Sequence, residues 1–318
     1  MLPSTEESNL YEFFRISEQI IPENPTHKTR LPRKVPGERC LSSKGWLIGI
    51  GQYWSVSLLH PFASLYVKLP NMITILNWNR VSHVLVIGKC FISASPLLTS
   101  DYIVIIIYGA LGELAYARPG DKVWNPIKGW YGCYVDISCY KGRFYAINKC
   151  GMIMACNIKD DNPPTAQEVA HMPQEIFKKC LKQFYIVESA GVLLVVSRRQ
   201  MRIRREKEGI SEWSYGNIRF HVYEVDIDTN TWTEIKNLGS RALFLDHNSS
   251  FSIETSDVSH CKPNSIYFTP NSTMNPHSWL CNGRKDGMGI YDLKDGSVIQ
   301  HYRGNSYSEL NPPIWIEG

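Results

Sequence analysis

Five carboxylates could take part in acid–base chemistry, because they lie in or beside strand-like segments. They are Asp136, Glu188, Asp226, Asp257 and Asp292. A glycosidase needs two such acids about 5–10 Å apart in an open pocket. Asp226 and Asp292, however, stand next to predicted hairpin turns, where an aspartate commonly hydrogen-bonds its own turn. We therefore favour a turn role for these two and keep a carbohydrate hydrolase as the alternative function.

Other catalytic and cofactor-binding patterns are missing from the sequence. It has no G-x-S-x-G nucleophile motif, and its histidines form no closely spaced pairs that could hold a metal. The nine cysteines include no CxxC pair, and an odd number without an export signal favours free thiols. The glycines of 49–51 lack the third glycine and the helix of a phosphate-binding loop. We expect no catalytic residue, no metal site and no cofactor.

A basic run, residues 197–209, is the sharpest charge feature. We interpret it as a solvated loop between two strands of one sheet, and it could also serve nuclear import or contact an acidic partner. Tryptophan is enriched where proteins bind one another. The candidate partner-binding residues are therefore Arg198, Arg199, Arg202, Arg204, Arg205, Trp213 and Trp279. They lie in the polar stretches 197–217 and 269–287, which we expect to be rim loops.

Strand signals recur along the whole chain. Short runs rich in Val, Ile, Tyr, Phe and Trp alternate with Gly, Asn, Asp and Pro turns, as in 140–158, 188–198, 223–235 and 289–302. Such pairs of strands around a tight polar turn are typical of antiparallel hairpins. A helical period occurs only in 166–181, where Pro173 interrupts it. The sequence predicts an all-β protein.

Strand-like segments also recur at an interval that is longer than a single hairpin. Segments that resemble inner strands recur near Trp46, Ile103, Phe144, Leu193 and Ile266, at intervals close to the ~40–50 residues of a propeller blade. We predict a β-propeller of five or six blades, each an antiparallel sheet of three to four strands, with a pair of β-sandwiches as the alternative. Residues 1–9 form a tail and 10–318 form one domain, whose ring both termini close.

Charge and hydropathy limit the partners and the cellular locations that we expect for this protein. The formal net charge of +4 is too small for a dedicated nucleic-acid binder. The start of the chain lacks the features of a secretory signal. The most apolar run, 102–108, is far shorter than the ~20 residues of a membrane helix, and we interpret it as a buried strand. We expect no membrane and no nucleic-acid partner, and a cytoplasmic or nuclear location or both.

Several blocks of the sequence resemble those of a known family. They include "SSKGWLI", "GCYVDISCYKGRFYAIN", "YIVESAGVLLVVSRR", "CKPNSIYFT" and "GMGIYDLKDGSV". In this order they are similar to the plant F-box-associated β-propeller family named for the kink-suppressor proteins. Family members begin with an F-box, which docks on the Skp1 adaptor of a cullin ubiquitin ligase, and use the propeller to capture the protein to be ubiquitinated.

The resemblance implies a non-enzymatic protein-interaction module, the substrate-recognition part of an F-box ubiquitin ligase that holds its client on a propeller rim. An F-box needs ~40–50 residues with a helical pattern, whereas the strand-like "LYEFFRIS" begins at residue 10. We therefore expect the F-box to be absent from this chain and a Skp1-type adaptor not to bind it.

Overall fold

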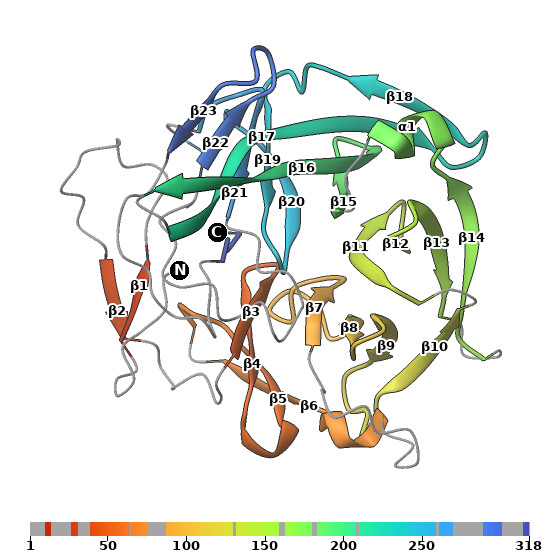
Figure 1. The fold of residues 1–318 in the computed structure, drawn as a ribbon. Helices are drawn as coiled ribbons and strands as arrows, with labels where there is room; N and C mark the ends of the chain where they lie inside the picture. Colours follow the sequence, from red (N-terminus) through yellow and green to blue (C-terminus); the bar gives the residue numbers. More distant parts are fainter. Residues whose placement is uncertain are drawn as a thin grey trace.

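The computed structural model describes residues 10–13, 27–30, 39–63, 65–75, 87–129, 132–158, 163–179, 183–207, 210–258, 261–269, 289–300 and 314–317. In this part of the chain five groups of strands stand around a common axis as the blades of a β-propeller, as predicted (Figure 1). Parallel pairing of Asn125–Gly129 with Thr165–His171, the last strands of the second and third blades, joins these two blades into one eight-stranded sheet. A separate two-stranded sheet pairs β1 (Leu10–Phe13) with β2 (His27–Arg30).

The first four blades follow one plan, in which consecutive strands pair antiparallel from the axis outward. The first contains β3 (Arg39–Ser43), β4 (Trp46–Ile50), β5 (Val56–Leu59) and β6 (Tyr66–Leu69). The second contains β7 (Ile87–Ile92), β8 (Val104–Tyr108), β9 (Glu113–Ala117) and β10 (Asn125–Gly129). The third contains β11 (Tyr134–Tyr140), β12 (Arg143–Asn148), β13 (Met152–Asn157) and β14 (Thr165–His171). The fourth contains β15 (Gln183–Ser189), β16 (Val192–Lys207), β17 (Ile210–Asp226) and β18 (Thr231–Ile235).

The fifth blade departs from this plan. It has five strands, ordered β20 (Ser250–Glu254), β19 (Arg241–Leu245), β21 (Ser265–Phe268), β22 (Gly289–Asp292) and β23 (Val298–Gln300). Its β19 and β21 run parallel, because β20 folds back onto the axial side of β19. The inner strands lie side by side around the axis, β3 beside β7, β7 beside β11, β11 beside β15, and β15 beside β20.

Tight turns explain how the inner strands double back. Lys44–Gly45, Lys141–Gly142 and Ala190–Gly191 each have positive φ at both residues. Two consecutive positive φ values give a type I′ turn, whose twist matches that of the flanking strands. These pairs join β3 to β4, β11 to β12 and β15 to β16. The hairpin around Ala190–Gly191 was predicted within 188–198, whereas the hairpin around Lys44–Gly45 was not predicted.

The core consists of layers between neighbouring blades. On β8, Val104 and Ile106 pack toward the first blade, whereas Ile105 and Ile107 pack toward the third. Successive side chains of a strand point to opposite faces, so a blade covered on both sides needs a continuous apolar strand. This explains the uninterrupted apolar run at 102–108, which the sequence analysis interpreted correctly as a buried strand.

Residues 314–317 lie between the last and the first blade. Ile314 and Ile316 pack against Leu47 and Leu59 of the first blade. Trp315 packs on the other side, against Phe244 of the fifth blade. That both termini complete a blade, and that 10–318 form one domain, stays a prediction.

Two predictions of local structure were wrong. The helix expected over 166–181 is replaced in its first half by β14, and α1 spans only Gln174–Lys179. Pro173 therefore precedes the helix, a position where its missing N–H costs nothing, and its carbonyl accepts the first backbone bonds. The loop expected at 197–209 is mostly strand, because β16 continues to Lys207 and pairs with β17 beyond the body of the blade.

Gly112, in the turn between β8 and β9, tests the contact between the second and third blades. Its φ is +60°, and a Cβ there would lie 2.7 Å from the Tyr134 carbonyl oxygen. We expect Gly112→Ala to lower the free energy of unfolding by about 2–4 kcal/mol, combining left-handed backbone strain with overpacking. Urea denaturation measures this loss. Gly120→Ala is the control, because Gly120 also has a positive φ but open space around its Cα; equal losses would contradict the close contact.

Candidate functional site

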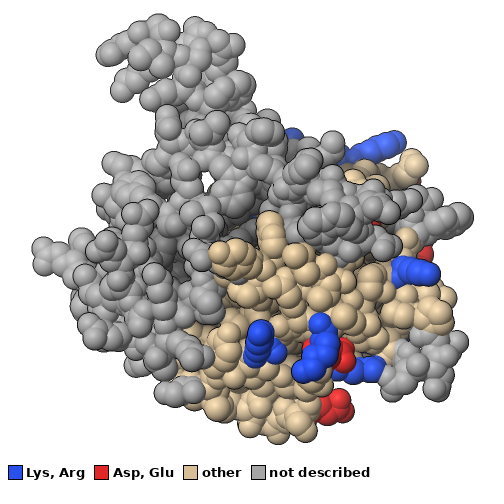
Figure 2. All heavy atoms as spheres, turned by 90° about the horizontal axis from the view of Figure 1, so that it is seen from below, with Lys and Arg blue, Asp and Glu red and all other residues tan. Residues whose placement is uncertain are grey.

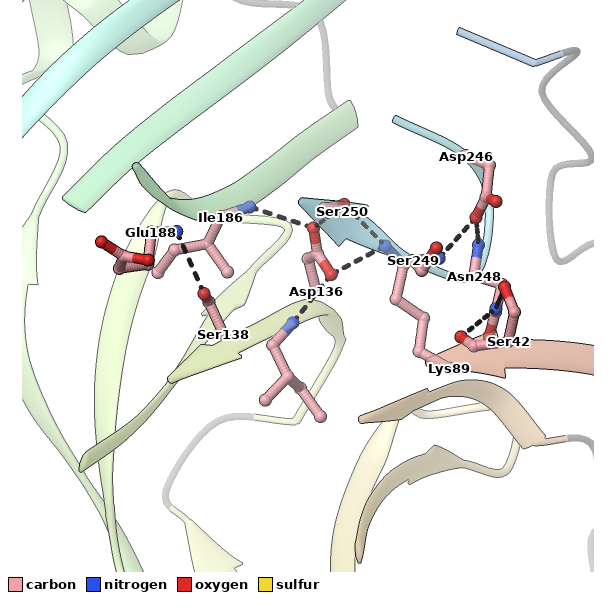
Figure 3. A network of polar contacts seen from close by, with 11 residues as sticks. Ser42, Lys89, Asp136, Ser138, Ile186, Glu188, Asp246, Asn248, Ser249 and Ser250 are labelled. Atoms are coloured by element: carbon pink, nitrogen blue, oxygen red, sulfur yellow. Dashed lines mark hydrogen bonds and ion pairs between the residues drawn. The ribbon is translucent and has the colours of Figure 1, made fainter. Parts of the chain in front are cut away.

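A polar cavity of about 210 Å³ lies where the inner strands meet. We call it the axial cavity (Figure 3). All five blades and the segment 314–317 contribute to its wall. Its main lining residues are Ser43, Lys44, Lys89, Asp136, Ser138, Glu188, Asn248, Ser249, Ser250, Phe251, Trp315 and Glu317.

The centre of its wall is a buried ion pair. Lys89 Nζ lies 2.7 Å from Asp136 Oδ1, and the two side chains are 6% and 2% exposed. Both residues stand at irregularities of their strands, since the pairing register shifts between Ile87 and Lys89 and between Tyr134 and Asp136. A β-bulge re-aims a side chain, which explains how two charged groups on otherwise apolar strands reach the axis.

Asp136 connects four blades. Its Oδ1 also accepts a bond from the Ile137 amide at 2.8 Å. Its Oδ2 accepts bonds from the Ile186 amide of β15 at 3.0 Å and from Ser250 Oγ of β20 at 2.7 Å. With Lys89 it therefore receives four hydrogen bonds, and a carboxylate bound in this way is a fixed structural acceptor.

Serines make similar bonds between neighbouring blades. Ser43 Oγ accepts a bond from the Ile92 amide at 3.0 Å, and Ser138 Oγ accepts one from the Glu188 amide at 3.2 Å. The hydroxyls of Ser189 and Ser252 lie 2.7 Å apart. The inner strands thus satisfy axial amides with side chains of the next blade, as buried polar groups require.

Asp246 organises the loop before β20. It is fully buried and accepts bonds from the Asn248 and Ser249 amides and, at 2.9 Å, from the Trp315 amide. Burial raises the pKa of its carboxyl, and the bonds from these amides oppose that rise. Asn248 Nδ2 donates to the Ser42 carbonyl at 2.7 Å, and Ser42 Oγ donates to the Trp315 carbonyl at 2.6 Å. The loop, the first blade and residues 314–317 are thereby connected.

Only two of the five candidate acids line the axial cavity, Asp136 and Glu188. Asp226 Oδ1 accepts bonds from the amides of Asp228 and Thr229, as the turn interpretation predicted. Asp292 likewise accepts a bond from the Lys294 amide, and Asp257 is exposed. Within the described ranges no group of histidines, cysteines and acids is arranged to hold a metal ion, and the seven described cysteines are free.

Asp292 gives the protein a predicted response to acid. Lys262 Nζ lies 2.7 Å from its Oδ2 and holds the pKa of this carboxyl below its usual range. The carboxylate therefore stabilises the fold above its unfolded-state pKa of about 4, and this contribution is lost as the pH falls through the folded-state value. We expect Asp292→Asn to destabilise the protein at neutral pH and to reduce its loss of stability on acidification, measured by urea denaturation. Asp257→Asn is the control for the change of charge, and an equal effect there would contradict the role of Lys262.

The sequence analysis missed Lys89, Asp246 and Asn248. A usable signal was present, because "IGKCFI" and "LFLDHN" place charged or amide residues inside or directly after buried apolar strands. Such residues are almost never fully buried unless they are paired.

Exposed apolar side chains gather on the first blade. Tyr53 is 88% and Phe62 68% exposed, and Leu65, Tyr66 and Ile73 are also exposed. Asn71 Nδ2 donates to the Tyr53 carbonyl at 2.7 Å, which joins the 3-10 turns Gln52–Trp54 and Met72–Ile75. Figure 2 shows the molecule from below Figure 1, and the described surface on that side is mostly uncharged.

A comparison with protein-family models decides between the two folds predicted from the sequence, the β-propeller and the pair of β-sandwiches. A model described as the KIB1-4 beta-propeller matches residues 13–292. The chain belongs to the KIB1-4 β-propeller family. The resemblance to plant F-box-associated propellers, inferred from sequence blocks, is confirmed.

Relatives of this KIB1-4 family chain come from Arabidopsis thaliana. A protein whose name marks it as a candidate F-box protein is 28% identical over 221 residues, which cover 69% of this chain and 58% of that protein. Another F-box protein is 26% identical and covered to 76%, with 75% of this chain matched. The F-box/kelch-repeat protein KIB1 is 24% identical, over 87% of this chain and 67% of its own length. The chain thus spans little more than half of the first relative, and what that whole protein does can only be proposed here.

The arginines at the start of the basic run of this KIB1-4 family member differ in how deeply they are buried. Arg198 is 2% exposed, donates to the Thr269 carbonyl at 2.8 Å and lies 4.9 Å from the centre of the Phe268 ring. It therefore belongs to the core between strands, and the expectation that it contacts a partner was wrong. Arg199 is half-buried.

The remaining candidates lie on the long hairpin or outside the described residues. Arg202, Arg204 and Arg205 pair along the backbone with Tyr215, Trp213 and Glu212. We call 199–207 with 210–219 the β16–β17 arm. Trp279 and most of the predicted loop 269–287 lie outside the described residues. No helix among the described residues is long and apolar enough to cross a membrane.

Proposed function

We propose that this propeller is a non-enzymatic protein-interaction module that recognises substrates for an F-box ubiquitin ligase, in the cytoplasm, the nucleus or both. The observation that carries the proposal is the family match over 13–292, together with relatives that are named F-box proteins. A propeller offers a rigid ring with many surface loops, which suits recognition of another protein.

The axial chemistry supports a binding role. A retaining or inverting glycosidase needs one acid to give and take protons and a second to act as nucleophile or base. Asp136 is held by Lys89 and three further donors, so its lone pairs are already engaged. The other two acids that line the cavity are Glu188 and Glu317. Glu317 Oε1 lies 3.9 Å from Lys44 Nζ, so among the described residues Glu188 is the one lining acid without a paired cation, and a single such acid does not make the pair that a glycosidase needs.

Two surfaces support contact with another protein. The β16–β17 arm extends a two-stranded ribbon past the blade and carries Arg202, Arg204 and Arg205 along one strand. The exposed apolar side chains of the first blade, Tyr53 and Phe62 among them, form the second surface, because exposed apolar side chains that gather on one part of a protein can mark an interaction site. We propose that the client contacts the arm and the rim beside it.

An assay that rebuilds the ligase tests this proposal. We expect purified chain alone not to bind a Skp1-type adaptor, and the chain fused behind the F-box of a relative to bind it and to ubiquitinate proteins in plant extract. Replacing Arg202, Arg204 and Arg205 with serine is expected to reduce capture and ubiquitination of the same proteins at least about tenfold, as loss of interface arginines does.

The matched control replaces three exposed lysines elsewhere, Lys122, Lys149 and Lys236, with serine. It makes the same change of net charge and should leave capture unchanged. Absence of any ubiquitinated protein that depends on the propeller, or an equal loss in both triple variants, would refute the proposed role of the arm. Direct adaptor binding by the unfused chain would refute the expectation that the adaptor is recruited only through the added F-box.

A further inference from the structure

We propose that the axial cavity binds a guanidinium group, supplied by an arginine side chain of the captured protein. This inference deepens the proposed function and depends on it for the source of the arginine. The binding site itself is argued from the size, charge and hydrogen-bonding groups of the cavity (Figure 3).

The size of the cavity fits one long side chain. Its 210 Å³ is below the ~300–1,000 Å³ of pockets for drug-sized ligands and coenzymes. It is several times the ~30 Å³ that one water molecule occupies in the liquid. A side chain that enters from a bound protein matches this volume better than a free cofactor does.

The charge of the cavity favours a cation. Its charged lining residues are Lys44, Lys89, Asp136, Glu188 and Glu317, two positive and three negative. Lys89 is neutralised by Asp136 at 2.7 Å, and Lys44 Nζ lies 3.9 Å from Glu317 Oε1. These pairs leave the negative charge of Glu188 to attract a cationic ligand.

Two residues of the cavity lining carry buried acceptors without a donor. Asn248 is 1% exposed, yet its Oδ1 receives no hydrogen bond from the described residues, and the same is true of Ser249 Oγ. The orientation of the Asn248 amide is fixed, because Nδ2 donates to the Ser42 carbonyl at 2.7 Å. Both residues line the cavity and are held by bonds from their amides to Asp246. A buried acceptor without a donor costs free energy, which a ligand N–H would recover.

Arginine meets these conditions better than lysine. Its planar guanidinium carries five N–H donors and can therefore donate to more than one acceptor of the lining, whereas an ammonium is a compact point charge. It is more weakly hydrated, so that its transfer into the cavity costs less. Phe251 and Trp315 of the lining offer aromatic surface, on which a guanidinium stacks favourably.

The test uses N-acetyl-arginine amide and the isotope-labelled chain, observed by NMR. We expect saturable shifts of amides that line the axial cavity, with millimolar affinity. N-acetyl-citrulline amide, which has nearly the same shape without the charge, should bind at least about tenfold more weakly, because charge-assisted hydrogen bonds are the stronger ones. Glu188→Gln should weaken arginine binding by about the same factor.

Glu188→Gln is a mild change, because Glu188 is exposed and glutamine can still accept the bond from the Gly191 amide at 2.8 Å. Glu224→Gln is the matched control, an exposed acid on β17 of the same blade that does not line the cavity. No saturable shifts, equal binding of citrulline, or an equal loss in both variants would overturn the proposal.

The NMR titration needs neither client nor adaptor. A negative result in the ligase assay would therefore not affect the test of guanidinium binding. The source of the arginine is tested separately by Glu188→Lys in the fused ligase, with Glu224→Lys as control. Loss of client capture in Glu188→Lys alone supports insertion of a client arginine. Undiminished capture by Glu188→Lys would show that clients do not use the cavity.

Discussion

Asp136→Ala is expected to lower the free energy of unfolding by about 3–5 kcal/mol, because it leaves the Lys89 ammonium buried without its carboxylate. The substitution also removes the acceptor of the Ile186 amide and of Ser250 on two other blades. Urea denaturation monitored by tryptophan fluorescence measures the loss. The exposed acid Asp257 provides the control, since Asp257→Ala changes the charge equally and should stay within about 0.5 kcal/mol of the parent.

A second substitution separates the two causes. Lys89→Met in the Asp136→Ala background removes the lone buried ammonium and should restore part of the lost stability, as replacement of buried ion pairs by apolar residues often does. The stability that stays lost reports the missing acceptor for the Ile186 amide and Ser250. A loss below about 1 kcal/mol in Asp136→Ala would contradict the view that this carboxylate connects the blades.

Trp315→Ala is expected to cost about 3–5 kcal/mol, the usual range for a large aromatic side chain removed from a core. Trp315 is 6% exposed, and its ring centroid lies 5.2 Å from that of Phe244 in an edge-to-face arrangement. Alanine keeps the backbone bond from residue 315 to Asp246, so the change isolates the packing of the side chain. Urea denaturation compares it with Phe62→Ala.

Phe62 serves as control because it is also a large aromatic residue but is 68% exposed. Its replacement should alter the free energy of unfolding by no more than about 0.5 kcal/mol. If both variants lost the same small amount, the contact of residues 314–317 with the fifth blade would contribute little to stability.

The blade strands could be predicted because their signals are local. Alternating apolar residues and X-Gly turns such as Ala190–Gly191 determine a hairpin within a dozen residues. The continuous apolar run at 102–108 also indicated a strand buried on both faces. These features depend on neighbours in the sequence, and the structure confirmed them.

The predictions that were wrong depended on tertiary pairing. The stretch 166–171 has helix-forming residues, but pairing with β13 draws it into a sheet. The arginine-rich run looked solvated, yet the strand it belongs to buries Arg198 between Phe220 and Phe268. Nothing in the local pattern distinguishes Arg198 from Arg199.

The axial cavity could be predicted only in part. Asp136 and Glu188 were recognised as candidates because they lie in or beside strand-like segments, whereas the fact that they line one cavity with Asn248 depends on which strands face the axis. The Lys89–Asp136 pair joins residues 47 positions apart through two strand irregularities. Sequence periodicity does not reveal bulges, which leave no regular pattern to detect.

β8 packs one row of apolar side chains against the first blade and the other row against the third. Removal of a blade from this ring would therefore expose the apolar faces of both of its neighbours to water. A chain from which one blade was deleted would therefore be prone to aggregation and degradation. A longer hairpin such as β16–β17, in contrast, extends past its blade and leaves the packing between neighbouring blades unchanged.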